Sequence, residues 1–468
     1  MKKLLFLLVV LAVQVARAQL VLPEILGDHM ILQQNAQVRL WGRADPGAEV
    51  KISASWGAEC EVRSDAAGHW TARLQTPAGG FGAESIRFRC GSTTRTLENV
   101  LIGEVWFAGG QSNMEMPLGG FVHCPVEGAN EAIARARKLR PRIRYAKIAH
   151  AGAYEPQEDA VGRWCEFTPE TAPRCSAVAF FFAELVSDAL DVPVGVIDCS
   201  WSSSPIESWL DRTTLETCAD VDLSPSALEA LPDSQRPMTM YNAMVHPLAG
   251  YTIRGFLWYQ GESNVMRHAD YGGRLADLVA LWRRAWGQGD LPFYLAEIAP
   301  FDYGHDQAPL LREAQWRAAA RIPGCAVVVT NDLVEEYERC NIHPRNKRGV
   351  GRRLGYHALA KTYGMDGVAS DYPQFASMEV AGNEIRLTFT HTEQGFNRLT
   401  GIEGFEVCGA DRIFRPARAR IEGLRVVVGS SEVERPVAVR YCFRSFQRGN
   451  LANARDMPVV PFRTDDFR

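Results

Sequence analysis

The chain has 468 residues, which is more than one ordinary hydrophobic core holds, so we expect two or three domains. Hydrophobic residues make up 46% of the chain and charged residues 23%, as is typical of globular proteins. The formal net charge is -4, and the sequence contains no basic tail or basic amphipathic helix, which argues against nucleic acid as a partner. The composition favours a small or polymeric solute instead.

The first residues have the pattern of a secretory signal peptide. Two lysines follow the first methionine, an apolar run extends from Leu4 to Val15, and a small-x-small cut site ends at Ala18. The apolar run is shorter than the about 20 residues that span a bilayer. A lipid anchor is not expected either, because there is no cysteine near the cut site. We expect residues 1–18 to be removed and the mature chain to be exported, periplasmic or secreted, without a membrane anchor.

Three stretches with different patterns follow. Residues 19–99 contain short alternating runs separated by turn signals, which predict a β-sandwich. Residues 100–368 alternate buried-strand runs with long helical patterns, which predict a doubly wound parallel sheet with helices on both faces. Residues 369–468 return to a β pattern. The predicted fold class is therefore α/β, with an N-terminal β-sandwich and a C-terminal β-rich region.

The cysteines allow disulfides but do not indicate a metal site. There are eleven of them, so at least one is unpaired. No CxxC spacing occurs. Three pairings would each stay within one region of the chain: Cys60 with Cys90, Cys165 with Cys175, and Cys408 with Cys442.

Four loops that follow strand candidates of the middle segment are rich in glycine and polar residues. They are residues 109–117, 199–209 and 259–264, and the loop after residue 330 that carries His343. Because the carboxyl ends of parallel strands meet at one edge of a sheet, we expect these loops to lie together. A serine, a histidine and several amides at one edge are what acyl transfer requires.

Within these loops, Ser112 is the candidate nucleophile, because it lies in a tight glycine-rich turn at a strand end. His343 is the candidate base, since its loop closes the same edge and directly precedes a helix. An oxyanion needs preorganised donors. We expect these to be the N–H of Ser112, an N–H from the turn at Ser203, and the side chain of Gln260. Glu262 fits better as a residue that fixes loop geometry than as a general acid or base.

Three motifs carry a resemblance to a known family: GEVWFAGGQSNMEMP around Ser112, WYQGESN from Trp258, and IHPRNK around His343. Over nearly its full length the mature chain resembles the sialate O-acetylesterase family, a carbohydrate-esterase branch of the SGNH hydrolases. The resemblance implies a flavodoxin-like catalytic domain with Ser112 as nucleophile and His343 as base. It also implies release of acetate from O-acetylated sialic acids, with 9-O-acetyl as the expected position, without metal or cofactor.

Two positions depart from the family's pattern. Serines occupy positions 202 and 203 where members commonly have two glycines. Serine keeps its N–H, but a β-carbon penalises a positive φ. Asn341 lies where many members place an aspartate shortly before the histidine. We therefore expect either a Ser-His dyad, which we favour, or a carboxylate such as Asp332 that folds in beside the histidine.

Two other functions stay open. The same chemistry could act on another glycan, such as acetylated xylan, since a sialate site should offer a cation or amide to the sugar's carboxylate. Alternatively, the chain could be a non-catalytic glycan-binding protein whose middle domain is a degenerate esterase. Turnover of a simple aryl acetate separates the second alternative from either enzyme.

Overall fold

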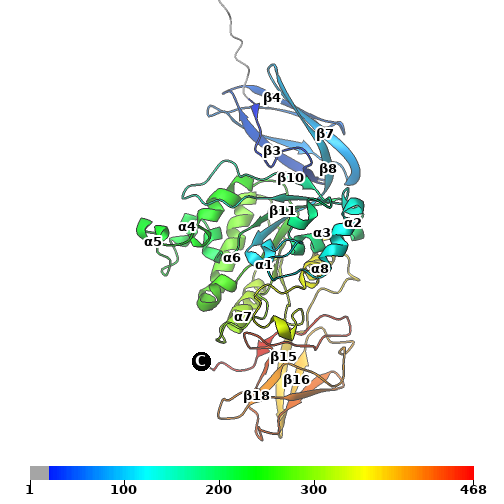
Figure 1. Cartoon of the computed structure of the whole chain (residues 1–468), viewed down its shortest axis with the longest axis vertical. Coiled ribbons are helices and arrows are strands. Elements are labelled where there is room, and N and C mark those ends of the chain that lie inside the picture. The colour runs from blue at the N-terminus through cyan, green and yellow to red at the C-terminus, as the bar shows by residue number, and fades with distance from the viewer. Residues whose placement is uncertain (1–19, 468) are drawn as a thin grey trace, which may run out of the picture.

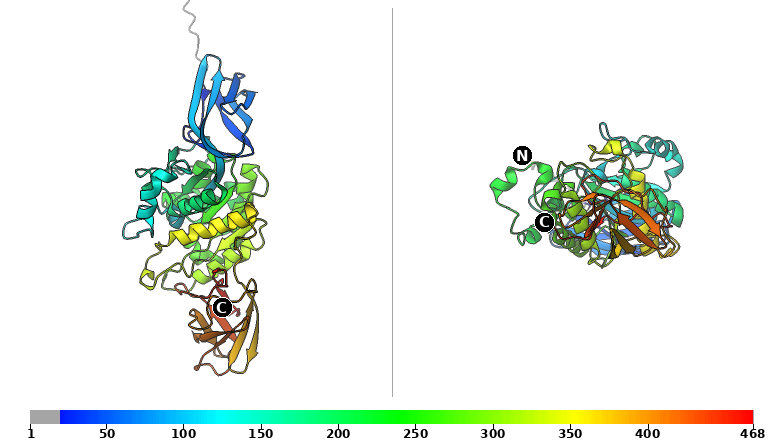
Figure 2. Two further views of the ribbon diagram at one scale, coloured as in Figure 1. Left: turned by 90° about the vertical axis from the view of Figure 1, so that its right-hand side faces the viewer. Right: turned by 90° about the horizontal axis from the view of Figure 1, so that it is seen from below.

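The computed structural model describes residues 20–467, so the predicted signal peptide lies outside the described residues. The described chain is elongated, and three parts follow one another along its long axis (Figures 1 and 2). A β-rich part lies at one end, a part with helices around a sheet lies in the middle, and a second β-rich part lies at the other end. The predicted site residues fall in the middle part.

The N-terminal part consists of two sheets, and several of their strands alternate buried and exposed residues. One sheet contains β1 (Leu20–Val21), β3 (Gln37–Ala44) and β6 (His69–Gln75). The other contains β2 (Ile31–Gln33), β4 (Glu49–Ala54), β5 (Glu59–Arg63), β7 (Gly80–Cys90) and β8 (Thr93–Gly110). In β6 every second side chain, such as Trp70, is buried, which is the pattern of a strand with one face on a core.

The middle part contains a sheet with the strand order β10-β9-β11-β8-β12-β13-β14. Its strands are β9 (Ile143–Lys147), β10 (Trp164–Glu166), β11 (Val194–Ser200), β12 (Gly255–Tyr259), β13 (Phe293–Ala296) and β14 (Cys325–Val328). All run parallel to β8 except β10, which is antiparallel to β9. From β8 the chain builds one side of the sheet and then the other. The carboxyl end of β8 is therefore the switch point, where open α/β sheets bind ligands.

The strand β8 also connects the first two parts. It is 18 residues long; it pairs antiparallel with β7 first, and then parallel with β11 and β12. The predicted boundary between residues 99 and 100 falls inside it. Glu104 fixes the junction, because its buried carboxylate accepts hydrogen bonds from Arg254, Tyr363 and two glutamines. We retain the division into three domains as a proposal.

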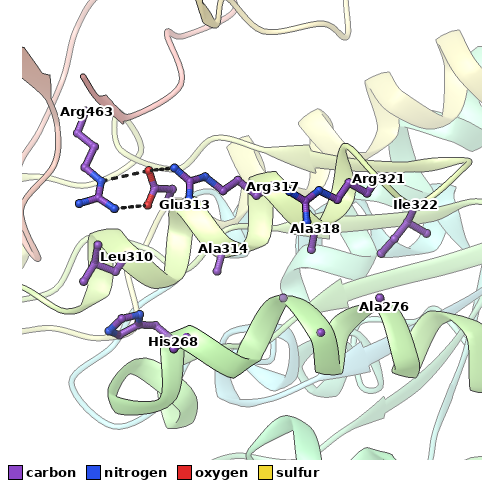
Figure 3. A pocket seen from close by; sticks show the side chains of 13 residues that line it. His268, Ala276, Leu310, Glu313, Ala314, Arg317, Ala318, Arg321, Ile322 and Arg463 are labelled. Carbon is purple, nitrogen blue, oxygen red and sulfur yellow. Dashed lines mark hydrogen bonds and ion pairs between the residues drawn. The ribbon is translucent and has the colours of Figure 1, made fainter. Parts of the chain in front are cut away.

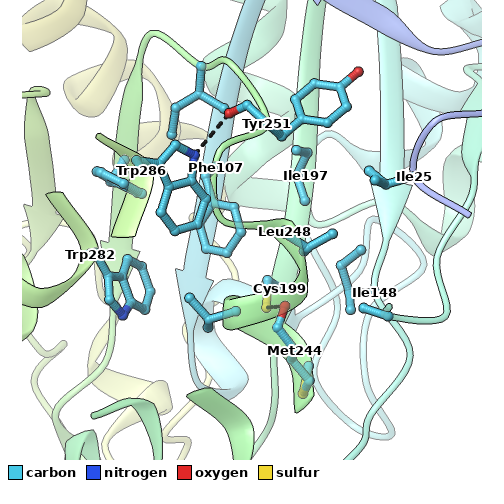
Figure 4. Packing of buried hydrophobic residues seen from close by; sticks show 14 of the residues in the cluster. Ile25, Phe107, Ile148, Ile197, Cys199, Met244, Leu248, Tyr251, Trp282 and Trp286 are labelled. Carbon is cyan, nitrogen blue, oxygen red and sulfur yellow. Dashed lines mark hydrogen bonds between the residues drawn. The ribbon is translucent and has the colours of Figure 1, made fainter. Parts of the chain in front are cut away.

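Alternate residues of β8 point into two separate cores. Phe107 packs against Trp282 and Trp286 of α6 on one face (Figure 4). Trp106 packs edge-on against Phe182 of α3 on the other face. The helices are α1 (Ser112–Glu115), α2 (Ala129–Leu139), α3 (Ala177–Leu190), α4 (Arg212–Leu215), α5 (Pro225–Glu229), α6 (His268–Trp286), α7 (Ala308–Ala319) and α8 (Lys347–His357). The predicted α/β fold class with helices on both faces is confirmed. In the described part of the chain, no helix has the length and apolar character needed to cross a membrane.

The C-terminal part has two four-stranded sheets around a small core of its own. The first contains β15 (Phe375–Ala381), β16 (Glu384–Phe389), β20 (Arg425–Gly429) and β19 (Arg418–Glu422). The second contains β18 (Arg415–Pro416), β17 (Phe405–Cys408), β21 (Ala438–Tyr441) and β22 (Phe462–Arg463).

An ion-pair cluster ties this part to α7. Arg463 pairs through two bonds of 3.2 and 3.0 Å with Glu313, which also accepts a bond from Arg317 (Figure 3). These side chains border a groove of about 530 Å³ between α6 and α7. None of the predicted site residues lines this groove, so it is separate from the candidate site.

All eleven cysteines lie within the described residues, and all are free thiols. The three disulfides considered from the sequence are therefore absent. Cys60 and Cys90, for example, lie on β5 and β7, which flank β4 on opposite sides. The fold is held by its cores and polar junctions instead.

Candidate active site

Ser112 begins the short helix α1 directly after β8 ends. The turn depends on Gly110, whose φ is +140° and whose missing β-carbon would lie 2.2 Å from the carbonyl oxygen of Tyr259. The next residue, Gln111, accepts hydrogen bonds from the N–H groups of Gly261 and Ser263. Ser112 is 7% exposed, so its hydroxyl lies just below the surface at the switch point.

Asn113 links the Ser112 turn to two other loops. Its Nδ2 donates to Glu262 Oε1 at 2.6 Å and to the carbonyl oxygen of Ile342 at 3.0 Å. Its Oδ1 accepts from Lys347 Nζ at 2.6 Å. Ile342 directly precedes His343, so the residues that follow Ser112 and precede His343 are bonded to each other. The structure thus brings the loops of the two predicted catalytic residues together, as well as that of Glu262.

The electrostatics of this cluster keep His343 uncharged. Burial raises the pKa of Glu262, whose Oε2 is buried without a hydrogen-bond partner among the described residues. Burial lowers the pKa of Lys347 to about 7, against the attraction of Glu262 and Glu338. For His343, burial and then the nearby Lys347 cation lower the pKa to about 4. Its imidazole is therefore neutral at neutral pH and able to accept a proton.

The two residues considered as supports for His343 have different surroundings. Asn341 Oδ1 accepts the backbone N–H of His343 at 3.0 Å. Both carboxylate oxygens of Asp332 instead bond to the guanidinium of Arg353. Asp332 is therefore committed to Arg353, and it does not supply a carboxylate to His343.

The predicted oxyanion donors differ in whether their N–H groups already have a hydrogen-bond acceptor within the protein. Gln260 is fully buried, and its amide N–H groups donate to Ser204 O at 3.0 Å and Asn264 Oδ1 at 2.8 Å. Its side-chain oxygen accepts from Tyr271. The expectation that Gln260 stabilises an oxyanion is therefore wrong, because its N–H groups already donate to Ser204 and Asn264 of the protein itself. Within residues 20–467, no protein acceptor takes the N–H of Ser112 or of Ser203.

Ser203 adopts the positive φ that a β-carbon penalises, at +64°. The preceding Ser202 is held by Glu115, whose Oε2 accepts both its N–H and its hydroxyl at 2.6 Å. Such charge-assisted bonds stabilise a turn that a serine at positive φ disfavours. The turn therefore keeps the N–H of Ser203 unbonded despite its β-carbon.

Sequence reasoning missed the basic side chains that contact Glu115. His150 Nε2 lies 2.7 Å from Glu115 Oε1, and its ring stacks on Trp201 at 4.5 Å. Lys147 lies 3.7 Å from the same oxygen and 3.2 Å from Asp198. Burial acts to raise the pKa of Glu115, but the hydrogen bond from His150 and the charge of Lys147 outweigh it and bring the pKa to about 2. Of this cluster, only Glu115 lies in one of the three sequence motifs, in the MEMP end of the first.

In the part of the chain that the structure describes, no three His, Cys, Asp or Glu side chains are grouped so as to hold a metal ion. The arrangement therefore offers a hydroxyl, a neutral imidazole and free backbone N–H groups.

Replacing Ser203 tests the backbone strain in the turn at Ser202 and Ser203. Because glycine has no β-carbon, Ser203→Gly should raise the free energy of unfolding by up to about 1 kcal/mol while leaving turnover intact. Ser203→Val should lower it by about 1 kcal/mol or more. Urea unfolding measures both. A glycine variant less stable than the wild type would show that φ strain does not govern this position.

Replacing Asn113 tests the link between the loops. Asn113→Asp cannot donate to Glu262, and it sets two carboxylates side by side, so we expect a loss of about 2–4 kcal/mol in unfolding free energy at pH 7. The loss should shrink at acid pH, where the carboxylates protonate. The exposed Asn383→Asp is the control, with a change within about 0.5 kcal/mol. Equal stability of the two variants would contradict the role of Asn113.

Comparisons with known proteins identify the family of the chain. A family model described as "Carbohydrate esterase, sialic acid-specific acetylesterase" matches residues 102–360. The crystal structure of a novel carbohydrate acetylesterase from Xanthomonas citri is 33% identical, covers 96% of this chain and 100% of its own, and has a TM-score of 0.85.

Curated relatives point the same way. Sialate O-acetylesterase of Homo sapiens is 26% identical and covers 79% of this chain and 76% of its own. That of Pongo abelii is 26% identical and covers 83% of this chain and 80% of its own. The family model alone spans more than half of the chain. The chain therefore belongs to the sialic acid-specific acetylesterase family of carbohydrate esterases, and it is a carboxylic ester hydrolase that removes acetyl groups from sialic acids or other glycans.

Proposed function

We propose that the chain is a serine esterase that removes O-acetyl groups from sialic acids, 9-O-acetyl first, through an acetyl-enzyme on Ser112. The observation that carries the proposal is the bonding of Asn113, which joins the loops of Ser112 and His343. The choice of sialic acid rests on the names of the curated relatives. From the predicted signal peptide, we also propose that the enzyme acts in the periplasm or outside the cell.

The proposed mechanism uses His343 twice. Neutral His343 takes the proton of the Ser112 hydroxyl while the oxygen attacks the acetyl carbonyl. The N–H groups of Ser112 and Ser203 donate to the oxyanion that develops. Collapse of this intermediate breaks the bond between the acetyl carbon and the sugar oxygen, which takes the proton from His343 and leaves as a hydroxyl. Water, deprotonated by the same histidine, then attacks the acetyl-enzyme and releases acetate.

A neutral acetylated glycan, such as xylan, is the second candidate substrate, and one observation favours it. Three basic groups near the site already have partners: Lys347 with Asn113, Lys147 with Asp198, and His150 with Glu115. A sialate carboxylate needs a free cation or amide, and none of these three is free. The similar protein from Xanthomonas citri is likewise described as a carbohydrate acetylesterase, a name that does not specify sialic acid.

Acetate release from 9-O-acetylated sialic acid and from acetylated xylan tests the nucleophile and the substrate together. We expect Ser112→Ala to lose at least about a thousandfold in kcat on whichever substrate the wild type turns over. Ser226→Ala, at an exposed serine, is the matched control. Preference for xylan would leave the mechanism standing and overturn the sialate assignment. A fully active Ser112→Ala would overturn the mechanism.

The pH dependence tests the role of His343. Because its pKa is lowered to about 4, the base form persists well below pH 6.5. We therefore expect kcat/KM for an aryl acetate to stay level from neutral pH down to about pH 5 and to fall as pH drops through about 4. A decline centred near pH 6.5 would mean that burial and Lys347 do not act on the essential base.

A further inference from the structure

We propose that Cys124 is the positioning residue of His343, in the place where a carboxylate completes a Ser-His-Asp triad. Cys124 Sγ lies 3.8 Å from His343 Nδ1 and 3.4 Å from Asn341 Oδ1. The inference rests on the proposed function, since the orientation of His343 matters only if it is the base. It assigns a role in the reaction to a thiol that neither the family's motifs nor the predicted site residues include.

A tight turn carries Cys124 to the histidine. The backbone groups of Phe121 and Cys124 bond to each other in both directions, at 3.0 and 2.9 Å. The turn contains His123 at a φ of +60° and follows Gly120 at +79°. Phe121 packs edge-on against the His343 ring, with centroids 5.2 Å apart. Two side chains of one turn thus contact the imidazole, one on the ring and one at Nδ1.

The hydrogen-bond directions around Cys124 follow from one donor whose direction is fixed, the backbone N–H of His343. Asn341 Oδ1 accepts the backbone N–H of His343 at 3.0 Å, which identifies this atom as the amide oxygen. An oxygen without hydrogen only accepts, so the Cys124 S–H donates to it. The sulfur then presents a lone pair to His343 Nδ1, which must carry the proton. His343 Nε2 is thereby left unprotonated and ready to accept the proton of Ser112.

The thiol supplies orientation without supplying charge. Among the described residues, no carboxylate lies within hydrogen-bond distance of either ring nitrogen of His343. The charge of Lys347 lowers the pKa of His343, and the charges of Glu262 and Glu338 act to raise the pKa of Lys347. A thiol that donates to Asn341 fixes the tautomer, but it stabilises an imidazolium less than an aspartate does. Placing a carboxylate at position 124 should therefore change the basicity of His343 as well as its orientation.

Variants at position 124 test this through kinetics. Cys124→Ala should lower kcat on an aryl acetate about tenfold, the effect of one ordinary hydrogen bond, with KM within about twofold. Cys124→Ser, which keeps a donor and an acceptor, should retain more of the rate. Cys124→Asp should move the acid limb of kcat/KM upward by about one pH unit or more. Cys340→Ala, at an exposed thiol three residues before His343, is the control and should match the wild type.

Labelling with a fluorophosphonate, with the modified serine located by mass spectrometry, separates this inference from the proposed function. Labelling of Ser112 in the wild type and about tenfold slower labelling in Cys124→Ala would support both. Labelling at the wild-type rate in Cys124→Ala would overturn the role of Cys124 alone, as would an unmoved acid limb in folded Cys124→Asp. Wild-type protein without label on Ser112 would overturn the proposed nucleophile. If circular dichroism shows Cys124→Asp unfolded, the labelling rates of the Ala and Ser variants decide.

Discussion

The candidate site depends on a buried amide that stands between two opposite charges. Asn113 donates to Glu262 and accepts from Lys347, and all three side chains are buried. Removing one partner of such a buried set typically costs about 3–5 kcal/mol, because the remaining charge keeps its desolvation penalty. The three residues come from the ends of β8 and β12 and from the start of α8. These segments must therefore reach their final positions together, and the geometry of the catalytic edge is tied to the stability of the fold.

The sequence predicts most of the sheet because its buried strands are short apolar runs, and it predicts which loops meet because parallel strands share an edge. It predicts neither β9 nor the charged cluster that β9 carries. Arg144 and Lys147 break the apolar pattern of this strand, and each is compensated by a partner distant in sequence, Glu166 and Asp198 respectively. No local pattern reveals a strand whose charges are neutralised by tertiary contacts. His150, which follows this strand, was missed for the same reason.

Gln260 and Ser203 show why motif positions alone do not assign hydrogen-bond donors. Gln260 lies in a motif and is polar, but its amide is used by Ser204, Asn264 and Tyr271. Whether an amide is free depends on side chains from several elements, which no spacing encodes. Ser203 shows the reverse case. Its β-carbon argues against positive φ, and yet the turn forms, since Glu115 anchors the preceding residue through two short bonds.

The surroundings of His343 make it a weak base that is unprotonated at neutral pH. Burial and Lys347 disfavour its charged form, and the sulfur of Cys124 rather than a carboxylate lies at Nδ1. A less basic imidazole gives less driving force for deprotonating a serine, so more of the barrier must be lowered where the negative charge develops. In the proposed mechanism, the backbone N–H groups of Ser112 and Ser203 supply that stabilisation. In the proposed mechanism, the turn at Ser202 and Ser203 and the weakly basic His343 are therefore complementary. A weaker base requires stronger stabilisation of the developing negative charge, and the anchored turn holds a backbone N–H in place to provide it.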